Sequence, residues 1–521
     1  MQYPPSTTMR PPTTRLLSPG MAKDLLPRNV RVRFCSGFFL LGTLNNIIYV
    51  VILSAALDLV DQASTPKGII LLVNITPALL VKIGWPYFVP GAPRYGRRVA
   101  WCSLLSFIGI LIVAMSGSLL PRLCGIAIAS FSSGLGEMTY LQKSTLYGSL
   151  SPPGRDEEDY GGTAVGWFSS GTGAAGIGGA GLWWIVRGLG VREGLLICSV
   201  LPVCMAASHF LLLPHLSVFA ALTQPSIPSG GTSTARYDAL ASSDREASAG
   251  NASEEEERGA LLHDAEETAE EEGAADEEAL EHQLDAKLPS LTTREKIELA
   301  KSLVKRYMVP LFFVYLAEYT INSGVAPTLL YKVPTKQSAP VLALVIKNLR
   351  DYYPLWQLLY QTFVFISRSS LSILHLPPLP LALLPLPTIL QVVILAITTC
   401  EAATSFLVAL FGEHGATWCT ALLVCCEGLC GGAAYVNAFH RLATEEGEDE
   451  GSDGEERLHS GSDGFGAKSK ARKDQEKEFQ ISSVGYADTL GITCASFLST
   501  ALEPLLCRTQ VARGRTYCRE L

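Results

Sequence analysis

The chain has 521 residues, of which 48% are hydrophobic and only 17% are charged. Soluble domains contain about 25% charged residues, so this composition, with a mean hydropathy of +0.26, excludes an ordinary soluble protein. The net charge of −8 is unevenly spread, because residues 254–285 hold 15 acids and one base and residues 445–463 hold 9 acids and one base. The remainder therefore carries +14, which is typical of a membrane protein with acidic loops. The sequence contains no basic, aromatic-rich stripe of the kind that binds nucleic acids.

Apolar runs long enough to cross a bilayer, which takes about 20 residues, occur eleven times. The six before residue 214 lie near 34–57, 68–90, 99–120, 123–148, 163–186 and 194–213, and the five after residue 306 lie near 307–331, 354–375, 380–411, 416–440 and 483–506. Prolines crowd the beginning of run 380–411 and leave its start open. The pattern predicts an all-α membrane protein of about 11, possibly 12, transmembrane helices in two halves.

The remaining segments divide the chain into tails and loops. We expect a cytosolic tail over 1–33, a first half over 34–213, a disordered acidic cytosolic loop over 214–306, the first part of the second half over 307–443, an acidic or charged cytosolic loop over 444–480, the last span over 481–506 and a tail over 507–521. The loops have too little apolar content to offset the entropy of ordering. Residues 292–306 are the exception, since their apolar spacing predicts an amphipathic helix against the membrane surface.

Basic residues orient the chain, because cytosolic loops carry an excess of Lys and Arg. The N-terminal tail, the loop between the second and third runs, and the segment before the seventh run are all basic and should face the cytosol. An odd number of spans places the C-terminal tail on the luminal side. Four arginines of that tail favour the cytosol instead: Arg508, Arg513, Arg515 and Arg519. The side of the C-terminus therefore stays open at this point.

Glycines in the fifth run spell G-x-G-x-x-G, from Gly171 to Gly176. A dinucleotide site needs a strand before this motif and a helix after it, whereas here the motif lies inside an apolar run. Small residues let membrane helices approach closely. We therefore interpret these glycines as helix-packing positions.

Ionisable residues inside predicted spans are costly and usually functional. The candidates are Glu137, Lys143, Glu318, Arg368, Glu401 and Glu427. The alternative to a role in handling solute or protons is a fixed interhelical ion pair, for example between Glu318 and Arg368.

Two weaker patterns support a transporter of two related halves. Arg94-Tyr95-Gly96-Arg97-Arg98 resembles the end of the loop motif of major facilitator transporters, with Pro93 in place of the expected Asp. A basic cytosolic loop that merely follows the positive-inside bias explains it equally well. SSGLGEMTYL in the fourth run and CEGLCGGAAYV in the tenth form a weak repeat, six spans apart.

Several ordered segments resemble the battenin family. They are residues 39–46 with 54–56, then SSGLGE at 132–137, SSGTGAAG at 169–176, VYLAEYTIN at 314–322, YQTFVFISRSS at 360–370, CEGLCGGAAYVNAFH at 426–440 and DTLGI at 488–492. The resemblance implies a major-facilitator-like fold in the lysosomal or vacuolar membrane. It also implies roles in vacuolar transport and luminal pH homeostasis, with links to basic amino acid levels and glycerophosphodiester export.

From these patterns we expect a transporter that carries a small polar or anionic solute, and possibly protons, through a central cavity. The candidate pathway residues are Asn45, Asn46, Tyr49, Glu137, Lys143, Glu318, Asn322, Arg368, Glu427 and Asn437. Lys143 and Arg368 could bind an anionic group, and Glu137 and Glu318 could carry protons. The alternative is a non-transporting scaffold that regulates the vacuolar proton pump or vesicle traffic through its acidic inserts. We expect no enzyme activity, cofactor or metal site, since no nucleophile–base pair or metal-binding cluster appears.

Two short motifs concern the cellular localisation of the protein. Glu257, Leu261 and Leu262 fit the acidic dileucine pattern that resembles a lysosomal sorting signal for adaptors. Cys518 lies four residues from the end, as in a prenylation box, but charged Arg519 and Glu520 stand where aliphatic residues belong. Most other cysteines lie in or beside apolar runs and are expected to be buried small hydrophobes.

Overall fold

The computed structural model describes residues 26–59, 67–88, 94–151, 159–223, 292–444 and 463–519, and within them every regular element is helical. The first half contains α1 (Arg28–Leu59), α2 (Lys67–Phe88), α3 (Tyr95–Met115), α4 (Leu119–Ser149), α5 (Tyr160–Val186), α6 (Val191–Cys198), α7 (Val200–Ala207) and α8 (Leu216–Thr223). The second contains α12 (Thr293–Leu303), α13 (Val309–Thr320), α14 (Pro340–Val345), α15 (Tyr352–Arg368), α16 (Leu386–Thr404), α17 (Phe406–Thr444) and α18 (Asp463–Ala512). Each of the eleven predicted runs overlaps a helix.

The bundle has the composition of a multi-pass membrane protein. Seven helical segments among the described residues are long and apolar enough to cross a bilayer, and Leu71–Trp85 forms a shorter apolar helix. Large apolar side chains such as Leu80, Leu120 and Leu422 are exposed on its outside. In water such a surface would aggregate, whereas lipid solvates it. The predicted all-α membrane fold is therefore confirmed.

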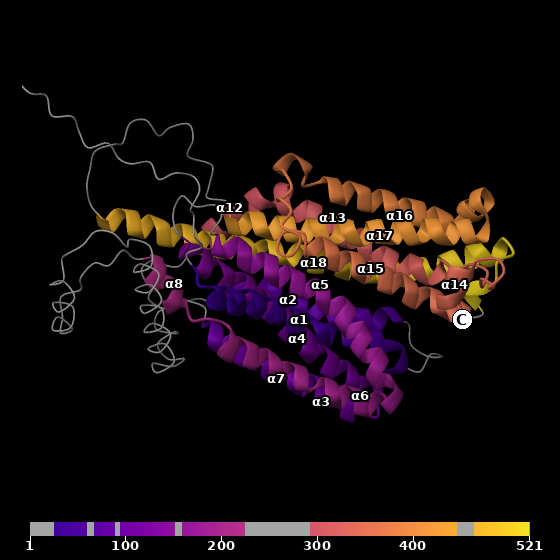
Figure 1. Ribbon diagram of the computed structural model, residues 1–521, viewed down its shortest axis with the longest axis horizontal. Coiled ribbons are helices and arrows are strands. Elements are labelled where there is room, and N and C mark those ends of the chain that lie inside the picture. Colours follow the sequence, from indigo (N-terminus) through magenta and orange to yellow (C-terminus); the bar gives the residue numbers. More distant parts are fainter. Residues whose placement is uncertain are drawn as a thin grey trace, which may run out of the picture.

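Helices pair in the same way in both halves. In the first half α1 packs mainly on α5, and both α2 and α3 pack on α4. In the second half α13 packs mainly on α18, and both α15 and α16 pack on α17. The two halves lie side by side, with α2 and α4 against α18 and with α5 against α15 and α17 (Figure 1). A repeated pairing shifted by six spans is the major-facilitator-like arrangement that the sequence predicts.

Glycines of α5 permit this contact between the halves. A Cβ atom at Gly173 would lie 2.9 Å from Cα of Phe365 in α15, and one at Gly176 would overlap the Gln361 side chain. Gly171 lies on the other side of α5, against the backbone of α1 at Phe39. The G-x-G-x-x-G segment is thus a helix-packing surface, as interpreted from the sequence.

Several boundaries differ from the sequence prediction. α1 begins at Arg28, inside the predicted tail, and α8 forms at the start of the predicted loop 214–306. The last helix begins at Asp463 rather than at residue 481, so the later part of the predicted loop 444–480 is helical. It also continues to Ala512, into the predicted tail.

The early start of α18 has a physical cause in its contact with α12. Arg472 Nη2 lies 2.6 Å from Glu295 Oε1, and the Lys296 ammonium lies 5.8 Å from the Phe479 ring. Hydrogen bonds from Thr292 and from Arg472 lower the pKa of Glu295 to about 2, so this carboxylate is ionised at neutral pH. α12 runs through a π-helical turn, Val304–Met308, directly into α13. It therefore continues into the seventh predicted span and packs on α18.

Candidate functional site

A buried ion cluster joins the two halves. Lys82 of α2 lies 2.9 Å from Glu137 of α4 and 3.4 Å from Asp488 of α18, measured between Nζ and the nearest carboxylate oxygen. Lys82 Nζ also donates to Thr489 Oγ1 at 2.9 Å. Lys82 and Asp488 are each only 4% exposed. Because buried charges need partners, this cluster holds α2, α4 and α18 in one arrangement.

Tyr435 of α17 connects the ion cluster to Arg368 of α15. Its hydroxyl donates to Glu137 Oε1 at 2.7 Å, and the Arg368 guanidinium lies 4.3 Å from the centre of its ring. The tyrosine therefore places an anionic and a cationic group next to each other across the interface between the halves.

Arg368 is a cation without a carboxylate partner among the described residues. Its Nη1 donates to Thr172 Oγ1 at 2.5 Å and its Nη2 donates to Tyr315 Oη at 2.8 Å, while its Nε is buried with no hydrogen-bond partner. Hydroxyl groups orient a guanidinium but do not neutralise it. A fixed, uncompensated guanidinium fork suits a carboxylate or phosphate ligand.

The depth of Arg368 follows from its contact with α5. Thr172 is twelve residues into that 27-residue helix, so it lies roughly 18 Å along a helix of roughly 40 Å. α15 ends at Arg368, and the following chain stays at this depth, where Ser170 Oγ and Ser372 Oγ are 2.5 Å apart. Non-helical backbone is tolerated at membrane depth only where protein or a cavity surrounds it. Arg368 thus lies near the middle of the bundle, not at its surface.

Two further carboxyl groups are buried beside this site without a cationic partner among the described residues. Glu318 accepts a short hydrogen bond from the Tyr360 hydroxyl, and Glu427 accepts from Asn322 Nδ2 at 3.1 Å. Gln357 in turn donates to Asn322 Oδ1 at 3.0 Å. The second oxygen of each carboxyl is buried with no partner. Glu318 and Arg368 do not form the ion pair that was the alternative interpretation.

The ends of these helices that are predicted to be cytosolic carry a second link between the halves. Arg98 donates to Gln142 Oε1 at 2.8 Å, and Gln142 donates to Ser482 Oγ of α18 at 2.8 Å. Arg98, near the start of α3, is therefore linked to α18 of the other half through Gln142 of α4. A small cavity between this link and the ion cluster is lined by Lys82, Glu137, Met138, Leu141, Ile481, Ser482 and Gly485.

The structure also places the other predicted pathway residues. Asn45 donates to the Ser133 carbonyl, and Asn46 donates to the Gly42 carbonyl of its own helix. Tyr49 is partly buried against the core, and Lys143 is buried 6.0 Å from the Tyr95 ring. Asn437 accepts from the Leu379 backbone, which fixes the loop after α15. These residues remain candidates on the sequence argument alone.

Glu401, an ionisable residue of the ninth predicted span, forms a hydrogen bond with the backbone. Its carboxylate accepts from the amide of Leu407 at 2.6 Å, where α16 turns into α17. Ser405 lies in that turn with a φ of 57°. Glu401 thus satisfies a buried donor at a helix junction.

Lys82 and Asp488 are site residues that the sequence analysis missed. Both lie within predicted spans, 68–90 and 483–506. The rule that identified the other ionisable residues therefore covers them as well. The sorting motif at Glu257, Leu261 and Leu262 lies outside the described residues.

Chemically, the site can bind and exchange charged groups. It offers a guanidinium fork, a three-membered ion cluster and two carboxyls that have no cationic partner in the part of the chain that the structure describes, connected through hydroxyl and amide groups. Among the described residues, no three His, Cys, Asp or Glu side chains are grouped so as to hold a metal ion.

Comparison with known proteins identifies relatives over nearly the whole chain. A model of the CLN3 protein family matches residues 36–509. Protein BTN1 of Mycosarcoma maydis is 43% identical over 95% of this chain and 90% of its own length. Protein BTN1 of Cryptococcus neoformans is 41% identical over 96% and 99%, and Protein btn1 of Schizosaccharomyces pombe is 31% identical over 96% and 99%.

Solved structures resemble the chain more distantly. The human organic anion transporter MFSD10 (TETRAN) aligns with a TM-score of 0.47 and 12% identity, covering 94% of this chain and 99% of that one. A POT family transporter in complex with a thioalcohol-conjugated peptide aligns with a TM-score of 0.46 and 11% identity, covering 92% and 96%.

Proposed function

The chain belongs to the CLN3 (battenin) family, and from that premise we propose that it is a transporter of the vacuolar or lysosomal membrane. It would carry a small anionic or polar solute through the centre of the bundle by rocking one half against the other. In this role it would contribute to luminal pH homeostasis, and would affect basic amino acid levels or export glycerophosphodiesters. The observation that carries the proposal is the guanidinium of Arg368, held near mid-depth between the halves without a carboxylate partner among the described residues.

In this mechanism the ion cluster would be the contact that breaks and forms again as the two halves move. Lys82 and Glu137 belong to one half and Asp488 to the other, so separating the halves at this end breaks a buried ion pair. A solute anion on Arg368 would change the field at Tyr435 and hence at Glu137. Solute binding and the contact between the halves would therefore be electrostatically linked.

Glu318 is the proposed proton carrier. A carboxyl buried in a span without a cation costs a few kcal/mol when ionised, so proton binding from one side and release to the other would follow its exposure. We expect Glu318→Gln to insert and reach its membrane normally, because the amide preserves the shape and can still accept from Tyr360. Solute flux by this variant should no longer depend on pH.

The test is flux into liposomes containing purified protein, measured against a pH series on each side. Glu298→Gln, a carboxyl on the exposed face of α12, is the matched control and should keep the pH dependence of the wild type. An unchanged pH profile in Glu318→Gln would contradict the proton role. Absence of any solute flux from wild-type liposomes would instead favour the regulatory scaffold, in which case deleting residues 224–291 should abolish function in cells.

We propose that localisation of the protein depends on the acidic dileucine motif, which sorting adaptors would bind in the cytosol. Replacing Leu261 and Leu262 together by alanine should shift part of the protein from the vacuolar or lysosomal membrane to the cell surface. Fluorescence microscopy of a tagged chain measures this. Leu280→Ala in the same loop is the control, and complete retention of the double variant on its normal membrane would show that the motif is not needed.

A further inference from the structure

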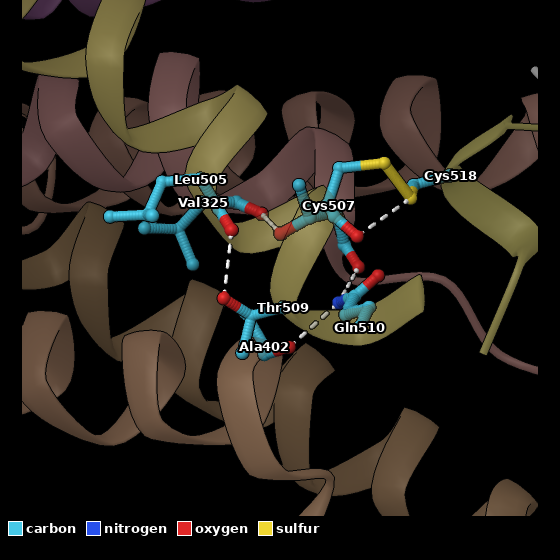
Figure 2. The surroundings of a disulfide bond; sticks show 8 residues. Val325, Ala402, Leu505, Cys507, Thr509, Gln510 and Cys518 are labelled. Carbon is cyan, nitrogen blue, oxygen red and sulfur yellow. Dashed lines mark hydrogen bonds between the residues drawn. A yellow bond between two sulfur atoms is a disulfide. The ribbon is translucent and has the colours of Figure 1, made fainter. Parts of the chain in front are cut away.

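A disulfide closes the far end of the last helix. Cys507 and Cys518 are bonded, with their Cα atoms 5.8 Å apart and a separation of 11 positions in sequence (Figure 2). The helix ends at Ala512, and the chain reverses at Gly514, whose φ is +86°. Such a φ suits glycine, because a Cβ atom would be strained there. The reversal brings Cys518 back alongside the last turns of α18.

The residues inside this loop fasten it to the rest of the second half. Gln510 Nε2 donates to the carbonyls of Thr328 at 2.9 Å and Ala402 at 2.8 Å. Figure 2 shows Gln510 beside Ala402 and the disulfide. Arg515 Nη2 donates to the Leu330 carbonyl at 2.9 Å and lies 3.6 Å from Glu413 Oε2. The clasp, meaning residues 507–518, thereby contacts the ends of three separate helical segments.

The structure places the clasp at the opposite end of the bundle from the beginning of α1. Arg33 Nε donates to the Leu212 carbonyl, and Phe34 packs on Phe219 of α8, so α1 begins at the α8 end. α8 and α12 lie at one end of the molecule, and α14 lies with the C-terminus at the other (Figure 1). If α1 begins in the cytosol, as its basic flank indicates, the clasp is on the luminal side.

We propose that the C-terminus of this protein is luminal and that Cys507 and Cys518 form a disulfide there, which locks the luminal ends of the second half together. Disulfides form and persist in the lumen of the secretory pathway, whereas cytosolic thiols are kept reduced. The two thiols lose two protons and two electrons as the S–S bond forms. A protein disulfide donor of that lumen takes up the electrons by thiol–disulfide exchange and is reduced to two thiols.

This proposal settles the conflict among the arginines of the tail. Arg515 is held by Glu413 and by a carbonyl, and positive-inside is a bias that a folded tail can override. It also excludes prenylation, since a sulfur bonded to Cys507 cannot form a thioether. The inference does not depend on what the protein transports.

The bond can be tested in the unmodified protein. Membranes are dissolved in excess N-ethylmaleimide, and the protein is digested with trypsin without reduction. We expect the peptide 516–519 to be recovered linked to the peptide 478–508 and to be released by a reductant. Recovery of both cysteines carrying maleimide, or of Cys518 carrying a lipid, would overturn the proposal.

The side of the membrane needs a separate measurement. In sealed vacuoles with their cytosolic face outward, added protease should remove a tag inserted in residues 224–291 and leave a tag after Leu521 intact. The second tag should be cut only after detergent is added. Cleavage of the C-terminal tag in sealed vacuoles would place the tail in the cytosol and overturn the proposal.

The structural role is read from thermal unfolding in detergent. Cys507→Ser, Cys518→Ser and the double variant should all lower the unfolding midpoint by the same amount, because each removes one bond. Cys494→Ser, a free thiol in the same helix, should leave the midpoint within error of the wild type. Additive losses in the double variant, or no loss in either single variant, would argue against a bond that locks this end.

Discussion

Replacement of Lys82 by methionine should abolish transport and destabilise the protein by about 3–5 kcal/mol, the cost of breaking a buried ion pair from one side. Methionine has a similar length and fills the same volume, so the loss reports charge and not packing. Glu137 and Asp488 would then lie in a buried interface without the lysine cation between them. Denaturant unfolding in detergent and liposome flux measure the two effects.

A triple variant separates the effect of one unpaired buried charge from the loss of the ion cluster itself. Lys82→Met together with Asp488→Asn and Glu137→Gln removes all three charges and should recover most of the lost stability, since neutral replacements of buried ion pairs are often tolerated. Transport should remain impaired, because the switchable contact is gone. Lys301→Met, an exposed lysine of α12, is the control. Wild-type stability of Lys82→Met alone would mean that the three groups do not form one buried cluster.

Arg368→Lys is expected to lower the affinity for solute by about tenfold or more, equivalent to about 1.5–3 kcal/mol. Lysine keeps the charge but cannot donate to Thr172 and Tyr315 in one plane while lying flat against Tyr435. The substrate concentration at half-maximal flux should rise, with the protein present at its normal amount and location.

The same substitution tests an alternative role for Arg368, that of a positively charged anchor at the membrane surface. An anchor needs only a positive charge, so full transport by Arg368→Lys would support it. Arg350→Lys, at an exposed position just before α15, provides the comparison and should behave like the wild type in flux and stability. The position of Arg368 opposite the middle of α5 is the reason to expect a loss.

Sequence patterns predicted the helices well because apolar length is a local property. They also identified Glu137, Glu318, Arg368 and Glu427, since a charge inside a span is visible without knowing the fold. Which charges meet is not visible, because that depends on how each helix is rotated and on which helices of the other half it contacts. The sequence therefore suggested Glu318 with Arg368, whereas the structure pairs Lys82 with Glu137 and Asp488.

Polar residues of loops and junctions were the hardest to interpret. Asn437 is one of the pathway candidates because it lies in a predicted span, yet its side chain accepts a hydrogen bond from the backbone of Leu379. The Leu379 amide needs this partner only because α15 ends at Arg368 and is followed by non-helical chain inside the bundle. Likewise, the extension of α18 depends on its contact with α12, which lies more than a hundred residues away in sequence.

The repeated pairing of helices has one further consequence. In the first half, Gly136 of α4 makes room for the side-chain oxygen of Asn45 in α1, and in the second half Gly431 of α17 makes room for a carboxylate oxygen of Glu318 in α13. These are corresponding places, because α4 relates to α17 as α1 relates to α13. The place in the first half holds the amide of Asn45, which stays neutral at every pH. The place in the second half holds the carboxyl of Glu318, which can gain or lose a proton. The duplicated architecture has thus kept the same close packing in both halves, whereas at this place only the second half holds a titratable group.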